Sequence, residues 1–242
     1  MIDLHCHILP EIDDGPQSLE EALAMARFFV EDGIQNVVAT PHCHRFVHLL
    51  TAEIIPAVRA FNECLCTLNI PLKILPGSEI QVTDTTEFRR EFEENVFCHL
   101  GDGTSFTLIE FNWSRDLFPP DASEMIDWLV ARGMTPIIAH PERIDYLAAE
   151  PALLDSMVEA GAWLQVTVDS LLGNHGRDPA IAGNAILRKH VNAVLASDAH
   201  NLRRCSGLTT GYNWVCEHLG DARSEDLFQR AESVRSRLVL PI

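Results

Sequence analysis

The sequence of 242 residues has no long apolar run and little positive charge. It contains no stretch of 18 or more consecutive apolar residues, so no transmembrane helix is predicted. Only two lysines occur, and the formal net charge is -17 at pH 7. Because nucleic-acid backbones are bound mainly by clustered Lys and Arg, this charge argues against a nucleic-acid partner. The N-terminal residues also lack the pattern of a signal segment, so we expect a cytoplasmic protein without membrane insertion.

The motifs of several common enzyme classes are missing. The seven cysteines are scattered and form no Cys-x-x-Cys pair, which favours reduced thiols. None of them is followed six positions later by arginine, so the sequence excludes the Cys-x5-Arg loop of cysteine-dependent tyrosine phosphatases. The Gly-x-x-x-x-Gly-Lys loop and the Gly-x-Ser-x-Gly elbow are also absent, which disfavours nucleotide hydrolysis and serine esterase chemistry.

Short apolar, β-branched runs alternate with helical patterns, the arrangement expected of βαβ units around a parallel sheet. The predicted strands are Ile2–Leu4, Asn36–Ala39, Leu72–Leu75, Phe106–Ile109, Thr135–Ala139, Trp163–Val166 and Ala193–Ala196. Four helices are predicted: one capped by Ser18 and ended by Gly33, one from Asp121 to Gly133, one over Pro151–Ala160, and one opened by Ser224. The length is compatible with one α/β barrel domain over residues 1–242.

Side chains typical of metal ligands follow six of these seven strands. In chain order they are His5, His7, Asp14, His42, Glu79, Glu110, His140, Asp198 and His200. The sixth strand ends differently, in Thr167 followed by Asp169 and Ser170. Because the carboxyl ends of all strands share one face in a parallel barrel, we expect the nine residues to converge there.

The spacing of these residues favours metal binding. His5 and His7 are two positions apart, so on an extended strand both side chains point the same way and can chelate one ion, as can Asp198 and His200. Imidazole and carboxylate ligands together suit zinc, manganese or iron, and one carboxylate can bridge two ions. Glu79 is the expected bridge. A single strand-end histidine is more often structural, but nine such residues favour a metal cluster, since buried carboxylates are costly without a cation.

In this order the motifs resemble the PHP superfamily, named for polymerase and histidinol phosphatase, and within it the bacterial capsule-type protein-tyrosine phosphatases. The matching segments are Asp-Leu-His5-Cys-His7 with Asp14-Gly-Pro, Ala-Thr-Pro-His42, Gly-Ser-Glu79-Ile, Leu-Ile-Glu110-Phe, Ala-His140-Pro-Glu-Arg143, Leu-Gln-Val-Thr and Ser-Asp198-Ala-His200-Asn. The resemblance covers nearly the full length. It implies a distorted (β/α)7 barrel with three divalent metal ions, usually manganese, with iron, zinc or magnesium as alternatives.

The resemblance also implies which residues hold each ion and the phosphate. It places His5, His7, Glu79 and Asp198 on the first ion, Glu79, Glu110 and His140 on the second, and Asp14, His42 and His200 on the third. It implies that Arg143 binds phosphate, whereas a helix-start salt bridge is the ordinary alternative. The family's second phosphate-binding arginine lies seven residues beyond Asp198, where this sequence has Cys205. A shorter loop would bring in Arg204, with Arg203 as the alternative.

Two segments leave the surroundings of the expected site open. The segment after His42, residues 43–48, lacks the small residues common in the family, and His44 is close enough to replace His42 as a ligand. No role is predicted for His48, His99, His175, His190 and His218. Residues 111–120 combine Phe111, Trp113 and Phe118 with Arg115 in a loop over the active face. This loop would hold a flat phosphotyrosine ring or, equally, anchor itself to the barrel.

The resulting hypothesis is a metal-dependent phosphomonoester hydrolase. A metal-activated hydroxide would attack the phosphorus, and Arg143 would clamp the phosphoryl oxygens. The resemblance implies a protein-tyrosine phosphatase linked to capsule or exopolysaccharide regulation, with a phosphotyrosine protein as partner, such as an exopolysaccharide tyrosine kinase.

Three other functions compete with this hypothesis. The first is a small-molecule phosphatase, such as one for histidinol phosphate. A metal-dependent amidohydrolase commonly uses a bridging carboxylated lysine, and neither Lys73 nor Lys189 follows a predicted strand. The last alternative is a metal-dependent domain that binds a partner without catalysis.

Overall fold

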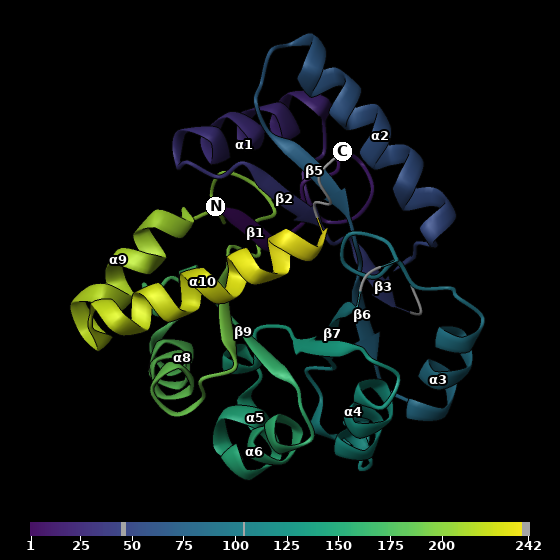
Figure 1. Cartoon of the computed structure of the whole chain (residues 1–242), viewed down its shortest axis with the longest axis vertical. Coiled ribbons are helices and arrows are strands. Elements are labelled where there is room, and N and C mark those ends of the chain that lie inside the picture. The colour runs from purple at the N-terminus through teal and green to yellow at the C-terminus, as the bar shows by residue number, and fades with distance from the viewer. Residues whose placement is uncertain (45–46, 104, 239–242) are drawn as a thin grey trace.

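Parallel strands alternate with helices along most of the chain (Figure 1). The computed structural model describes residues 1–44, 47–103 and 105–238, without the side chains of residues 47 and 48. The strands are β1 (Ile2–Cys6), β2 (Asn36–Ala39), β3 (His42–His44), β4 (Val47–His48), β5 (Lys73–Pro76), β6 (Glu79–Val82), β7 (Phe106–Phe111), β8 (Thr135–Ile138), β9 (Trp163–Thr167) and β10 (Ala193–Ala196). The helices are α1 (Leu19–Glu31), α2 (Thr51–Thr67), α3 (Thr85–Glu93), α4 (Ala122–Val130), α5 (Asp145–Ala149), α6 (Pro151–Glu159), α7 (Val168–Leu171), α8 (Arg177–Lys189), α9 (Leu208–Leu219) and α10 (Asp221–Leu238), with 3-10 turns η1 (Arg115–Leu117) and η2 (Pro141–Arg143).

The strands form two sheets that are linked at both edges. One sheet has the order β1-β2-β5 and the other the order β10-β9-β8-β7-β6-β3-β4, with every pair parallel except β3 and β4. β2 continues into β3 and β5 into β6 after two residues each, and β2 pairs with β5 as β3 pairs with β6. At the other edge, the Asp198 N–H donates to the His5 carbonyl oxygen at 2.9 Å, and the His7 N–H donates to the Ala199 carbonyl oxygen at 2.9 Å.

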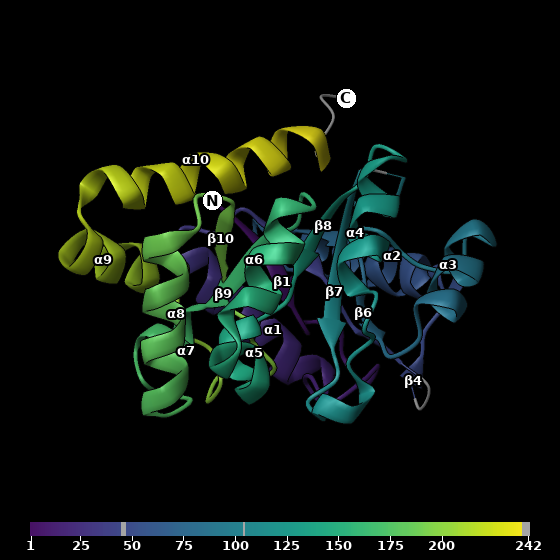
Figure 2. The same cartoon turned by 90° about the horizontal axis from the view of Figure 1, so that it is seen from below.

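Helix α10 covers the amino-terminal ends of the strands, next to the N-terminus of the chain (Figure 2). Leu4, Leu108 and Val194, from three different strands, belong to one buried hydrophobic cluster with Ala231 and Val234 of α10. Each large apolar side chain buried in this way contributes roughly 1.5–3 kcal/mol to stability. The polar residues at the carboxyl ends of the strands therefore lie at the opposite end of the sheets from α10.

All seven predicted strands are present, each within two residues of its predicted bounds. The sequence did not predict β3, β4 and β6, which have two to four residues each, nor helices α2, α3, α5, α7, α8 and α9. The predicted start of the last helix at Ser224 is wrong, because α10 begins at Asp221. Gly220, with φ of 93°, ends α9 and lets the next helix begin at once, while the Ser224 hydroxyl donates to the Tyr212 carbonyl oxygen instead of capping.

The fold is thus mixed α/β with parallel sheets, as the alternation of patterns predicts. All seven cysteines are free thiols. Among the described residues, no helix is both long and apolar enough to cross a membrane.

Candidate metal centre

The structure brings all nine predicted ligand residues into one cluster at the carboxyl ends of the strands. Their ligand atoms form four overlapping groups, and within each group the atoms lie within 4.8 Å of one another. The groups are His7, Asp14, His42 and His200; His5, His140 and Asp198; His5, His7 and Glu79; and His42, Glu79 and Glu110. The overlap makes this one continuous cluster of ligand-type side chains rather than several separate groups.

Glu79 lies at the centre of the cluster and is buried. Its Oε1 is 3.4 Å from His5 Nε2 and 2.8 Å from His140 Nε2. Its Oε2 is 3.4 Å from His7 Nε2 and 2.9 Å from His42 Nδ1. Burial opposes ionisation of this carboxyl, but the surrounding imidazoles, His5 foremost, lower its pKa well below the usual range. A carboxylate in contact with four imidazoles has the placement required of a bridging ligand.

Asp14 closes the solvent-facing side of the cluster. Its Oδ1 is 3.3 Å from His42 Nε2 and 3.3 Å from His200 Nε2, and hydrogen bonds from these two imidazoles lower the pKa of its carboxyl. The loop that carries it returns closely over β1, since a Cβ at Gly15 would lie only 2.4 Å from the His7 carbonyl oxygen. A glycine at this position therefore allows Asp14 to reach the other two residues of its group.

Two of the nine residues have a left-handed backbone, which is uncommon outside glycine. His140 follows β8 with φ of 30°, and Asp198 follows β10 with φ of 50°. A residue held in such a conformation costs of order 1–3 kcal/mol, and such residues concentrate at active sites. The β1 register also shifts against β2 between Asp3 and Cys6, an irregularity of the kind that redirects a side chain such as His5. Irregular backbone geometry thus occurs at the cluster in β1 and directly after β8 and β10.

Hydrogen bonds outside the cluster orient three of the imidazoles. In each case Nδ1 faces an oxygen acceptor and Nε2 faces the cluster; the pairs are His5 with Gln165 Oε1 at 3.0 Å, His7 with Asp13 Oδ2 at 2.7 Å, and His200 with the Asp198 carbonyl oxygen at 2.9 Å. Histidines that bind metal characteristically donate their second ring N–H in this way. Asp13 and Gln165 were not predicted as part of the site. The signals in the sequence were the doubled Asp13-Asp14, the absence of a ligand after the sixth strand, and the Leu-Gln-Val-Thr segment that contains Gln165.

The arrangement fits divalent cations. His5 and His7 both donate through Nδ1, so in their neutral forms their Nε2 lone pairs face each other at 3.3 Å. Among the described residues, the buried atoms without a hydrogen bond include Asp198 Oδ1 and His140 Nδ1. Although burial disfavours its charged form, hydrogen bonds to Asp13 and Glu79 raise the pKa of His7 to about 10. The cluster therefore attracts positive charge, and its nitrogen and oxygen ligands suit manganese, iron or zinc.

Arg143 lies at the edge of the cluster. Its guanidinium is hydrogen-bonded to Asp198 Oδ2 and lies 5.2 Å from the centre of the Trp113 ring. It therefore pairs with a residue of the cluster and not with a helix start. Arg204 is half-buried, and its charge contributes, after burial and the charge of His7, to lowering the pKa of His200. Arg203 is exposed, which leaves Arg204 as the better placed of the two.

The three aromatic residues after Glu110 separate into two roles. Phe111 and Phe118 are buried, with ring centres 5.0 Å apart, and anchor the loop. Trp113 is 49 % exposed and lies over His140. The sequence analysis left open which aromatic side chain of this loop lies near the cluster, and in the structure it is Trp113.

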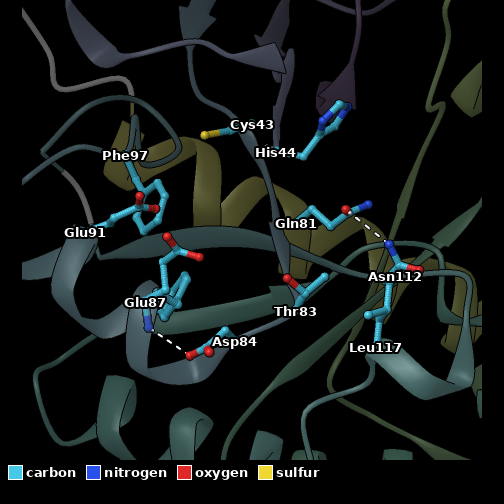
Figure 3. A pocket seen from close by; sticks show the side chains of 11 residues that line it. Cys43, His44, Gln81, Thr83, Asp84, Glu87, Glu91, Phe97, Asn112 and Leu117 are labelled. Carbon is cyan, nitrogen blue, oxygen red and sulfur yellow. Dashed lines mark hydrogen bonds between the residues drawn. The ribbon is translucent and has the colours of Figure 1, made fainter. Parts of the chain in front are cut away.

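A pocket adjoins the cluster beside β3 and β6 (Figure 3). Gln81 connects the two, because its Nε2 donates to Glu110 Oε2 at 2.9 Å while its Oε1 accepts from Asn112 at 3.3 Å. His44 lines this pocket, with its ring centre 5.5 Å from that of His42, and belongs to none of the four groups. The alternative that His44 replaces His42 as a ligand gains no support from this placement.

Comparison with known proteins identifies the family. The sequence profile described as Capsular polysaccharide synthesis, CpsB/CapC, matches residues 1–234. The chain belongs to the CpsB/CapC family. Among named relatives, tyrosine-protein phosphatase YwqE of Bacillus subtilis (strain 168) is 36% identical over 204 residues, which span 84% of this chain and 78% of the relative. The putative tyrosine-protein phosphatase CapC of Staphylococcus aureus is 31% identical over 206 residues, 84% of this chain and 78% of the relative.

Solved structures extend the similarity of this CpsB/CapC chain to its fold. It matches a chain from the crystal structures of YwqE from Bacillus subtilis and CpsB from Streptococcus pneumoniae, which are described as unique metal-dependent tyrosine phosphatases. The TM-score is 0.90 at 33% identity, covering 98% of this chain and 94% of the other. The putative histidinol phosphatase hisK from Listeria monocytogenes has a TM-score of 0.51 at 11% identity, covering 84% of this chain and 97% of the other, which indicates a shared fold only.

Proposed function

We propose that this chain is a metal-dependent protein-tyrosine phosphatase whose substrate is a phosphotyrosine protein of capsule or exopolysaccharide synthesis, such as a tyrosine kinase of that system. The main support is the cluster of nine imidazole and carboxylate side chains, which includes two inward-facing Nε2 atoms 3.3 Å apart. The names of its relatives support the choice of phosphotyrosine over other phosphoesters.

Three divalent ions, with manganese first among the candidates, would be held by overlapping ligand sets. His5, His7, Glu79 and Asp198 would hold the first, Glu79, Glu110 and His140 the second, and Asp14, His42 and His200 the third. The central position of Glu79 supports its role as the shared ligand. The charges support bound cations, because the cluster holds four carboxylates and the one described guanidinium contact to them is that of Arg143 with Asp198.

Bound divalent ions would lower the pKa of water and neutralise phosphoryl oxygens. The residues of the chain perform the positioning. Gln165 and Asp13 hold the imidazoles of His5 and His7 in place through their Nδ1 atoms. Arg143 would bind two phosphoryl oxygens through its planar guanidinium, and Arg204 would add a second positive charge. A tyrosyl leaving group has a pKa near 10 and needs little protonation, so we assign no separate general acid.

Residues 1–242 would form one domain, a distorted (β/α)7 barrel. Seven strands would form the barrel, with β2 and β3 counted as one continuous strand and β5 and β6 as another. The remaining five are β1, β7, β8, β9 and β10. Backbone hydrogen bonds join His5 and His7 to the segment after β10. They support this arrangement, because they would close the barrel between β1 and β10.

Hydrolysis of three substrates by one preparation tests the function. The protein is stripped of metal, reloaded with manganese, and assayed with a phosphotyrosine peptide, the matching phosphoserine peptide and histidinol phosphate. We expect activity only after reloading, with kcat/KM for the phosphotyrosine peptide at least about tenfold above the others, or roughly 1.4 kcal/mol of selectivity. Equal or faster turnover of histidinol phosphate would identify a small-molecule phosphatase. Full metal loading without hydrolysis of any phosphoester would identify a binding domain.

A further inference from the structure

Trp113 is fixed at the rim of the candidate metal centre although half of it remains exposed. Its indole N–H donates to Glu110 Oε1 at 3.2 Å. Its ring stacks on His140, with ring centres 5.9 Å apart and an interplanar angle of 23°. The Arg143 guanidinium lies 5.2 Å from its ring centre. Three contacts to three residues of the site thus hold the indole in one orientation, while 49 % of the residue stays accessible to solvent.

Packing of the loop does not require this indole. Phe111 and Phe118 anchor the loop in the core, and the Tyr146 hydroxyl ties it down by donating to the Asn112 carbonyl oxygen at 2.7 Å. Isolated exposed apolar side chains are ordinary on protein surfaces and imply nothing by themselves. Trp113 differs from them because every described polar or ring contact it makes is to a residue of the candidate site.

We infer that the exposed part of the Trp113 ring is the binding site for the aromatic ring of the substrate. This inference rests on the proposed function and names the part of the site that selects aryl over alkyl phosphates. In an aryl phosphate the ring is one oxygen atom away from phosphorus, so a phosphoryl group on Arg143 places the ring beside the indole that Arg143 contacts. Aromatic pairs gain about 0.5–1.5 kcal/mol beyond burial, and an alkyl phosphate has no ring to contribute this gain.

The test compares two substitutions that separate the contribution of the aromatic ring from that of the indole N–H. Trp113→Leu removes all aromatic character and the N–H, whereas Trp113→Phe keeps one aromatic ring and removes the N–H together with the five-membered ring. The readout is the ratio of kcat/KM for a phosphotyrosine peptide to kcat/KM for the matching phosphoserine peptide, because damage to Glu110 affects both substrates alike. We expect the ratio to fall about 3- to 10-fold in Trp113→Leu and to stay within about twofold of wild type in Trp113→Phe. An unchanged ratio in Trp113→Leu, or an equal fall in both variants, overturns the inference.

Binding supplies a second readout that needs no turnover. Calorimetric titration of the manganese-loaded protein with phenylphosphonate and with methylphosphonate should show that Trp113→Leu weakens the phenyl ligand about 3- to 10-fold relative to the methyl ligand. Trp214→Leu is the matched control, because Trp214 also stacks on a histidine, His218, that belongs to no candidate metal group. The same loss in Trp214→Leu would overturn the inference.

The two proposals fail differently. A wild-type protein that binds phenylphosphonate through Trp113 but hydrolyses no phosphotyrosine peptide would disprove the proposed function and leave the aryl site standing. If the protein hydrolyses the phosphotyrosine peptide but its ratio of kcat/KM values is the same in wild type and Trp113→Leu, only the aryl site is disproved.

Discussion

The Asp13 carboxylate accepts a hydrogen bond from His7 Nδ1 at 2.7 Å, while His7 Nε2 faces Glu79. The same oxygen, Oδ2, also accepts the backbone N–H of His42 at 3.1 Å, and Oδ1 accepts the Gly15 N–H at 3.0 Å. One side chain that is not itself a predicted ligand therefore positions two residues that are. Its pKa is lowered, since the bonds from His7 and the two backbone amides outweigh its burial.

Replacing Asp13 should weaken metal binding without removing a ligand. In Asp13→Ala the imidazole of His7 loses its acceptor, and we expect manganese affinity to fall about 10- to 100-fold, the usual effect of losing such a partner. Asp13→Asn keeps one acceptor oxygen and should lose less. Asp32→Ala is the control, because Asp32 accepts from Thr209 and belongs to no candidate metal group. Unaltered affinity in Asp13→Ala, measured by competition with a chelating dye, would contradict the role of this carboxylate.

His140→Ala should abolish phosphatase activity while leaving the fold intact. The substitution removes a buried ring that contacts Glu79 at 2.8 Å, and a predicted ligand should matter at least as much as an outer partner. We expect kcat/KM to fall by more than about 100-fold. Far-UV circular dichroism and the bound manganese per chain should be measured on the same sample. Near-normal turnover would remove His140 from the ligand set.

Arg143→Lys should be nearly as damaging as Arg143→Ala. Lysine keeps the charge but lacks the planar pair of donors that matches two phosphoryl oxygens. We expect both variants to lose about 10- to 1,000-fold in kcat/KM for a phosphotyrosine peptide, the range for loss of a donor to transition-state charge. A lysine variant with wild-type kinetics would mean that only the ion pair with Asp198 matters.

Arg204 and Arg203 form a matched pair of adjacent arginines. Arg204 is half-buried and its charge acts on His200, whereas Arg203 is exposed. Arg204→Ala should therefore raise KM for phosphotyrosine peptides about tenfold, and Arg203→Ala should change it by less than about twofold. Steady-state kinetics of both variants decides the matter. The reverse ranking would assign the second phosphate contact to Arg203.

The stability of the protein should fall in mild acid partly because of His99. Burial lowers the pKa of this imidazole, despite the opposing charge of Asp102, and its Nδ1 is buried without a hydrogen bond. As pH falls through about 6.5, the unfolded chain binds the proton first, so the free energy of unfolding decreases until the folded state is protonated as well. His99→Leu should remove this part of the loss.

Urea unfolding of the manganese-loaded protein at pH 7.5 and 5.5 measures this difference. The fall in the free energy of unfolding should be smaller in His99→Leu than in wild type. The exposed His218, replaced in the same way, should leave the difference unchanged. An equal fall in wild type and His99→Leu would show that this imidazole does not contribute.

The sequence predicted the elements with the strongest patterns and missed the short ones. β2 and β10 have their predicted bounds because both are buried along their whole length and, apart from Asn36, apolar. β6 was missed because its four residues, Glu79–Val82, alternate polar and apolar side chains, whereas the strand prediction was based on apolar runs. Helix α2 has Pro56 in its interior and Leu50 at its N-cap, so both helix signals are weak. Instead, β6 is stabilised by pairing with β3 and β7, and α2 is stabilised by burial of its apolar face.

The sequence alone determined which residue types stand at the strand ends, and parallel strands place those ends on one face. Tertiary structure decided everything that depends on distances between remote segments. His5 meets Gln165 across 160 positions, and Arg143 meets Asp198 across 55. The choice of Trp113 as the exposed aromatic likewise follows from how Phe111 and Phe118 pack. Periodicity acts along the chain, whereas hydrogen-bond and stacking partners are fixed only when the strands assemble.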